Sequence, residues 1–307
     1  MKKIIIAIIL ITTSCAGALA CDICGSGSGN TYFGLLPGFQ KKFLGIRYQY
    51  NSLRHHLGPN GENTYLTARE QFHVAEVWGA VNLGKRFRVA GFIPYSFASR
   101  RQAGQTQHTN GLGDVSVIGY YKLAGSTDDN PSGAWQHQAW LGAGLKLPTG
   151  KYNADETNIA QGAQNSFQLG SGSLDYVFNA VYDIRYKNTG LSTNLSYRLN
   201  SSNRFNYQYG DKWNANLQLY SMLGQKNKVT VKPHAGFLYE SASRDLNDAH
   251  LPVWQSGGDM GLATMGLDVS FGRISVSTSY QHVLFQQLGE DRIRGGNRVM
   301  AGLNWIW

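Results

Sequence analysis

The stretch Trp213-Asn214-Ala215-Asn216-Leu217-Gln218-Leu219-Tyr220 alternates apolar and polar residues without a break. In an extended strand successive side chains point to opposite faces, so this pattern predicts a strand with one apolar and one polar face. The same alternation recurs in about twelve segments along the chain. These segments lie near 42–53, 71–83, 86–97, 112–123, 135–148, 171–186, 190–200, 211–223, 228–241, 259–271, 273–286 and 297–307. The phase of 71–83 is ambiguous, because Phe72 and Val74 stand on one face while Val77 and Val81 stand on the other.

The connections between these segments alternate in length. Long ones fall near 54–70, 98–111, 149–170, 201–210, 242–258 and 287–296, and tight turns such as Gly84-Lys85 and Gly272-Arg273 fall between them. Long loops at one end and tight turns at the other are typical of a transmembrane antiparallel β-barrel. An even strand count places both termini on the tight-turn side, which is periplasmic in such barrels. The sequence therefore predicts an all-β outer-membrane barrel of a Gram-negative bacterium.

The end of the chain supports this prediction. The last segment alternates up to Trp305 and Trp307, so the chain ends on an aromatic residue within a strand pattern. Terminal aromatic residues of this kind resemble the signal that outer-membrane insertion machinery reads. They also suit the aromatic girdle at the periplasmic interface. Outer-membrane lipid and this machinery are the partners that the pattern predicts.

Composition excludes several other classes of protein. The chain has 307 residues and a net charge of +9, yet only 15% of its residues are charged and 12% are aromatic. Disordered chains have few aromatic residues and more charge. Helical membrane bundles need repeated long apolar runs, and the mean hydropathy is −0.30. The basic residues are scattered along the sequence rather than clustered, which argues against nucleic-acid binding.

The N-terminal residues form an export signal. Lys2 and Lys3 precede a short apolar core at 4–11, and Ala18-Leu19-Ala20 matches a signal-peptidase site. Residues 1–20 are thus a predicted signal peptide, and the mature chain begins at Cys21. Lipidation of Cys15 or Cys21 competes with this interpretation, although neither has Leu three residues before it. Residues 21–40 are Gly-rich and predict a short periplasmic or lumenal segment, long enough to obstruct the barrel, which would occupy 41–307.

Cys21 and Cys24 are the two cysteines of the mature chain. In an exported protein such a pair predicts a local disulfide. Two thiolates with the α-amine of Cys21 could instead hold a soft ion such as Cu(I), which defines an alternative function as a metal-linked barrel. No His follows Cys24, so haem attachment is excluded. No cofactor is predicted, and the identity of any metal is open.

Charged residues within the strands mark the predicted lumen. A Lys or Arg that faces lipid at mid-bilayer costs roughly 2–4 kcal/mol, so these residues should face inward. They either fill the interior with salt bridges or line a narrow wet path. The lumen-lining candidates, with His234 among the inward positions, are Arg47, Lys122, Lys146, Asp175, Asp183, Arg185, Arg198, Lys232 and Asp268.

Four short motifs stand at predicted strand edges: Gly91-Phe92-Ile93-Pro94-Tyr95, Gly111-Leu112-Gly113-Asp114, Leu147-Pro148-Thr149-Gly150 and Gly170-Ser171-Gly172-Ser173-Leu174-Asp175. In this order they resemble the outer-membrane β-barrel transporter family labelled with the MetA pathway of phenol degradation. The resemblance covers about residues 75 to 305 and implies passage of small molecules, hydrophobic ones among them. From the residues alone, Gly permits close strand approach, and Asp114 and Asp175 should accept backbone N–H bonds or pair with an inward Arg or Lys.

The predicted function is an outer-membrane channel or transporter whose small-molecule substrate is open. The alternatives are the metal-linked barrel and a structural outer-membrane protein. An enzyme is disfavoured, because Ser279 and His282 lie three residues apart on one strand and so point to opposite faces.

Overall fold

The computed structural model describes residues 41–125, 135–154, 165–224 and 229–307. The signal peptide, the segment 21–40 and the Cys21–Cys24 pair lie outside these ranges. Across the described ranges no helix is both long and apolar enough to cross a membrane.

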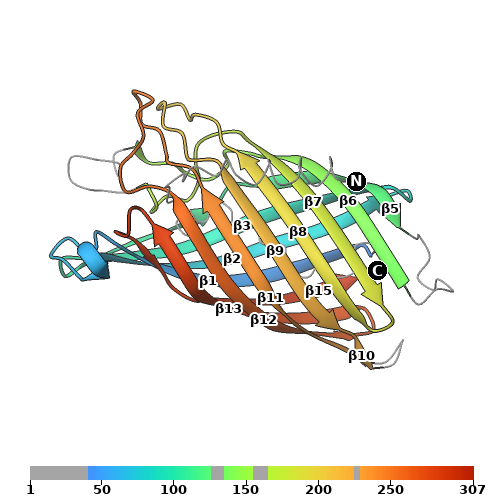
Figure 1. Ribbon diagram of the computed structural model, residues 1–307. Coiled ribbons are helices and arrows are strands. Elements are labelled where there is room, and N and C mark those ends of the chain that lie inside the picture. The colour runs from blue at the N-terminus through green and yellow to red at the C-terminus, as the bar shows by residue number, and fades with distance from the viewer. Residues whose placement is uncertain (1–40, 126–134, 155–164, 225–228) are drawn as a thin grey trace, which may run out of the picture.

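Twelve long antiparallel strands form a closed barrel, in which each strand pairs with its neighbour in the chain and the last strand, β15, pairs with the first. Figure 1 shows the strands running obliquely around the wall. The strands of the wall are β1 (Phe43–His55), β2 (Ala68–Leu83), β3 (Phe87–Gln102), β5 (Ser116–Gly125), β6 (Trp135–Lys146), β7 (Asp175–Tyr186), β8 (Thr189–Leu199), β9 (Lys212–Ser221), β11 (Val229–Ala242), β12 (Gly258–Phe271), β13 (Ile274–Leu288) and β15 (Arg298–Ile306). The predicted barrel and its strand number are confirmed.

Three short strands and one helical turn complete the described chain. β4 (Gln105–Leu112) pairs with β3, β10 (Leu223–Gly224) pairs with β11, and β14 (Arg294–Gly295) pairs with β1. The 3-10 turn η1 (Pro59–Gly61) lies in the connection between β1 and β2. Closure leaves the wall without an open edge, as a strand array in lipid requires.

The prediction of a loop at 98–111 is wrong. β3 continues to Gln102, and the chain returns as β4, so this region is a β-hairpin. Ala103 and Gly104 at its tip have φ of 49° and 80°, the left-handed values of a tight two-residue hairpin turn. The sequence hid β4 because its residues are polar on both faces and therefore show no apolar period.

The apolar face of each strand points out of the barrel. Leu217 is 44% exposed on the outside, whereas its neighbour Asn216 is 6% exposed inside. The ambiguous phase of β2 is settled by its carboxylates: Glu70 and Glu76 are buried on the same face as Phe72. In this phase the two carboxylates stay inside the protein and away from lipid. The apolar residues on the same face of β2, such as Phe72, therefore face inward as well.

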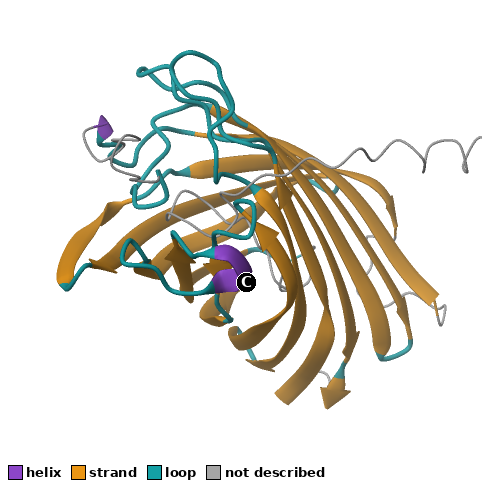
Figure 2. Ribbon diagram, turned by 60° about the vertical axis from the view of Figure 1, so that its left-hand side comes forward, coloured by secondary structure: helices purple, strands orange, loops and turns teal. Residues whose placement is uncertain are grey.

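The two ends of the barrel differ, as the connection lengths predict. The loops that follow β1, β6, β8, β11 and β13 gather at one end, here called the long-loop end (Figure 2). At the other end, the short-turn end, two-residue turns join β7 to β8 and β12 to β13. The chain also ends there, because β15 runs from the long-loop end to the short-turn end.

Candidate functional site

The interior of the barrel is the candidate site, and the nine lumen-lining candidates lie on its face. Six are buried: Arg47, Lys122, Lys146, Asp175, Arg198 and Asp268. Asp183, Arg185 and Lys232 are half-buried there, and His234 is buried beside them. They do not form one cluster. Lys146 pairs with Asp175, Lys232 lies 3.4 Å from Asp268, and Arg47 pairs with Glu76, so the charges are distributed around the wall. That they line a path for substrate stays a prediction.

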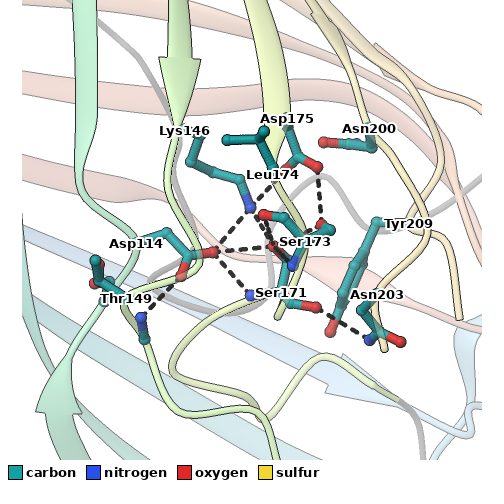
Figure 3. Close-up of polar contacts among 12 residues, drawn as sticks. Asp114, Lys146, Thr149, Ser171, Ser173, Leu174, Asp175, Asn200, Asn203 and Tyr209 are labelled. Atoms are coloured by element: carbon teal, nitrogen blue, oxygen red, sulfur yellow. Dashed lines mark hydrogen bonds and ion pairs between the residues drawn. The ribbon is translucent and has the colours of Figure 1, made fainter. Parts of the chain in front are cut away.

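One ion-pair cluster joins two of the sequence motifs through Lys146, which directly precedes a third (Figure 3). Lys146 Nζ lies 2.8 Å from Asp114 Oδ2 and 2.5 Å from Asp175 Oδ2, and it also donates to Ser171 Oγ. All four residues are almost fully buried. Lys146 balances one of the two carboxylates, and buried Arg198, which interacts electrostatically with both, supplies the second positive charge. Every buried charge of the cluster then has a counter-charge, which is the condition for such a cluster to be tolerated.

The same cluster fixes the loop between β6 and β7. Asp114 Oδ1 accepts a hydrogen bond from Gly150 N at 2.9 Å, and its Oδ2 accepts one from Ser171 N at 2.8 Å. A Cβ on Gly170 would stand only 2.4 Å from Asp114 Oδ1, so this position requires glycine. The predicted roles of Asp114 and Asp175 are therefore observed: both pair with an inward lysine, and Asp114 also accepts backbone N–H bonds.

From this anchor, residues 165–171 enter the barrel; we call them the inserted segment. Asn165, Ser166, Phe167, Gln168 and Leu169 are all buried. Tyr209 OH donates to the carbonyl of Asn165 at 3.1 Å, which fixes the segment on the β8–β9 side. Gln168 is hydrogen-bonded to Asn153 of the same loop. Ser166 and Phe167 contact residues of β1, β2 and β3. The inserted segment thus spans the interior between parts of the wall that are not adjacent.

Glu70 on β2 receives the inserted segment. Its Oε2 accepts a hydrogen bond from Ser166 Oγ at 2.9 Å and lies 2.8 Å from His55 Nε2, while its Oε1 accepts one from Arg100 Nε at 2.6 Å. The arrangement differs from a hydrolytic triad. There the acid and the serine contact different ring nitrogens of the histidine, whereas here both contact Nε2 of His55. The group therefore differs in geometry from a triad, and its contacts position the loop.

Phe167 is buried inside the barrel beside this group. Its ring lies 6.5 Å from that of Phe72 and 4.5 Å from Arg100 Cζ. It joins an apolar cluster from both sides of the barrel, whose other members include Leu53, Leu238, Met260, Leu262, Leu288 and Met300. A second apolar cluster, nearer the short-turn end, lies on β1 to β7 and includes Phe43, Trp78, Phe92, Ile118, Tyr120 and Trp140.

Sequence reasoning missed these inward apolar residues and the Glu70 group. The strict division of apolar-out and polar-in assigned every apolar residue to lipid. His55 and Glu70 fall in the predicted loop 54–70, although the alternation of Ala68, Glu70 and Phe72 extends the strand and could have revealed it. The inserted segment carries no strand period, so no signal in the sequence marks Phe167.

The remaining predictions concern the Ser279–His282 pair and possible metal ligands. Ser279 faces the interior and His282 the outside, as expected for residues three apart. Within the part of the chain that the structure describes, no three His, Cys, Asp or Glu residues are grouped as metal ligands. The disulfide and metal hypotheses for Cys21 and Cys24 concern residues outside that part and stay predictions.

Comparison with protein families gives one match. Residues 61–277 match the family described as "Putative MetA-pathway of phenol degradation". The chain belongs to this family. The match spans Asp114, Lys146, Asp175 and the inserted segment, so the anchored loop lies within the family region. A comparison with proteins of curated function finds no match.

Solved structures show the same fold. The COG4313 outer membrane channel from Pseudomonas putida F1 is 12% identical, and the alignment covers 89% of this chain and 100% of that one with a TM-score of 0.64. The transport unit of the autotransporter AIDA-I from Escherichia coli is 11% identical over 90% and 93% of the two chains, with a TM-score of 0.47. The CymD monoaromatic hydrocarbon channel is 7% identical over 87% and 88%, with a TM-score of 0.39. The first of these similarities establishes the fold. Together with the apolar outer face it places this family member in the outer membrane.

Proposed function

We propose that this protein is an outer-membrane channel or transporter that passes small hydrophobic molecules. The observation that carries the proposal is the apolar cluster around Phe167, inside a barrel whose interior should otherwise be polar. Met260, Leu262 and Leu288 of this cluster have no exposed surface. Apolar side chains at this place give an apolar solute a favourable environment and give a hydrated one none.

The charges beside the cluster are neutralised in pairs. Arg298 donates to both carboxylate oxygens of Glu240, at 3.0 and 2.6 Å, and Arg100 is paired with Glu70. A paired and buried charge attracts a polar solute only weakly, because its hydrogen bonds are already made. The interior therefore favours apolar solutes over ions, and passage requires the inserted segment to move.

The orientation supported best has both termini in the periplasm and the long loops outside the cell. Barrels of this type place short turns in the periplasm. Trp305 and Trp307 at the short-turn end are each 52% exposed, as residues of an interfacial aromatic girdle would be. In this proposal the protein passes solutes and catalyses no reaction. The arrangement of Ser166 and His55, which differs from that of a hydrolytic triad, supports this. The two alternatives make different predictions: a metal-linked barrel loses metal without its Cys pair, and a structural protein passes no solute.

Uptake measurements test the proposal. Cells that make the protein should accumulate a labelled small aromatic compound faster than cells without it, while a sugar of similar size should enter at unchanged rate. Met260→Gln should slow the entry of the aromatic compound, because it places an amide in the apolar cluster. Leu251→Gln is the matched control, since Leu251 is 60% exposed in a loop. Equal acceleration of the sugar, or none of the aromatic compound, would contradict the proposal.

A further inference from the structure

Four arginines form a row across adjacent strands at the long-loop end. Arg54 on β1 pairs directly with Arg69 on β2, and Arg69 pairs with Arg101 on β3. Arg54 also pairs with Arg294 on β14. Residues directly opposite each other in an antiparallel pair project from the same face, with Cβ atoms about 4.5–5.5 Å apart. We call these four residues the arginine row.

The row lies on the outside of the barrel. Ala68, Glu70 and Arg100, the chain neighbours of Arg69 and Arg101, are buried inside, so the two arginines point outward. Both are exposed, and Arg54 and Arg294 are half-buried.

The row lacks acidic partners. Within the described ranges no ion pair includes any of the four, and Arg294 reaches only a backbone oxygen, that of Gln286, at 3.5 Å. Like charges directly opposite each other destabilise a sheet. An anion from outside the protein would therefore relieve the repulsion among the four guanidinium groups of the row.

The height of the row on the wall indicates which anion. Along β3 the outward residues run from Ile93 through Tyr95 and Phe97 to Ser99 and then Arg101, all but Ser99 well exposed. Arg101 lies four residues beyond Phe97, about 13 Å along the strand. With a strand tilt of about 40°, this is about 10 Å along the membrane normal. The row thus stands beyond the outward ring pair of Tyr95 and Phe97, which suits the membrane interface. This height corresponds to the lipid headgroups.

We propose that the arginine row binds the phosphate groups of the phosphorylated glycolipid in the outer leaflet of the outer membrane. Guanidinium groups bind phosphate with two parallel hydrogen bonds, and adjacent guanidinium groups on a sheet can engage closely spaced phosphates. The proposal rests on the proposed orientation, which places the long-loop end in that leaflet. It adds a lipid site to a surface that takes no part in passage through the lumen.

Matched charge variants of the full-length protein test this site. The variant Arg54→Gln/Arg69→Gln/Arg101→Gln removes three positive charges from the row, and Lys85→Gln/Arg86→Gln/Arg273→Gln removes three from the short-turn end. Each folded protein is titrated in detergent with bisphosphorylated lipid A, with its dephosphorylated form and with inorganic phosphate, and bound lipid is counted by native mass spectrometry. The row variant should bind lipid A at least about tenfold more weakly than wild type and control. Wild type should discriminate against the dephosphorylated form.

Three results would overturn the proposal: unchanged lipid A binding by the row variant, equal binding of the dephosphorylated lipid, or full competition by millimolar inorganic phosphate. Heat-modifiability on gels confirms folding, and Arg69→Gln alone serves if the triple variant does not fold. Aromatic uptake is measured with the same variants and should be unchanged. If wild-type protein did not accelerate uptake of the aromatic compound, the result would count against the proposed function alone. Lipid binding in detergent reports on the arginine row alone.

Discussion

The two halves of the barrel interior are filled in different ways. Near the short-turn end, Trp78 and Trp140 belong to a cluster supplied by neighbouring strands of the wall. Near the long-loop end, Phe167 comes from a loop and joins residues from strands on both sides of the barrel, such as Phe72 and Met260. The first half is filled by the strand pattern itself, and the second depends on an anchored loop. A loop can move without breaking the wall, so we expect passage to be controlled in the long-loop half.

The largest expected effect comes from removing the anchor of that loop. Lys146→Met leaves Asp114 and Asp175 buried without their shared counter-charge, which costs about 3–5 kcal/mol when one partner of a buried pair is lost. The free energy of unfolding measured in denaturant should fall by this amount. The triple change Asp114→Asn/Lys146→Met/Asp175→Asn should recover part of the loss, because it also removes the two buried negative charges. Recovery stays incomplete, because buried Arg198 then loses both nearby carboxylates. Equal stability of wild type and the single variant would show that the loop is held by other contacts.

The next effect tests the wall that both halves share. Leu217→Arg places a charge on the lipid face and should destabilise the barrel by roughly 2–4 kcal/mol. Asn194→Arg, at a half-buried inward position on the neighbouring strand, should be tolerated much better. Refolding yield into lipid vesicles compares the two variants. Equal yields would contradict the assignment of the faces.

A smaller effect on stability, but a clear one on passage, is expected at the inserted segment. Phe167→Ala removes the ring between Phe72 and Arg100 and should raise single-channel conductance severalfold while the barrel stays folded. Trp78→Ala, in the other apolar cluster, should mainly lower stability, because truncation of a buried aromatic residue in a packed cluster costs about 3–5 kcal/mol. If Trp78→Ala raised conductance and Phe167→Ala did not, control of passage would lie in the short-turn half.

The smallest effect concerns pH at the long-loop end. Asp245 joins two loops, since its carboxylate accepts hydrogen bonds from Tyr207 OH at 2.5 Å and Gly210 N at 2.8 Å. Burial raises the pKa of Asp245 from 3.8 to about 6, although these bonds and Lys212 oppose the shift. Because the folded protein has the higher pKa, the protonated carboxyl stabilises the loops, and this contribution is lost as pH rises through about 6.

Hydrogen exchange of residues 200–211 and 243–257, corrected for the intrinsic rate, should therefore show more protection at pH 5 than at pH 7. Asp245→Asn should remove the difference. Protection that rises with pH would mean that the carboxylate, rather than the carboxylic acid, holds the two loops together.

The sequence by itself determined the wall. Strand number, the sorting of long loops and short turns, and the inward position of residues such as Lys146 all follow from a period of two, because neighbouring side chains in a strand must point to opposite faces. Even the pairing of Asp114 and Asp175 with an inward lysine was predictable, since a buried carboxylate requires a partner.

Only the tertiary structure decided what the loops do and which residues meet across strands. The inserted segment has no period, so its contact with Glu70, nearly a hundred residues earlier in the chain, could not be seen locally. Arg54, Arg69 and Arg101 are far apart in the sequence, and strand register alone makes them a row. Local patterns report on the environment of one strand at a time, whereas register and loop docking depend on closure of the whole barrel.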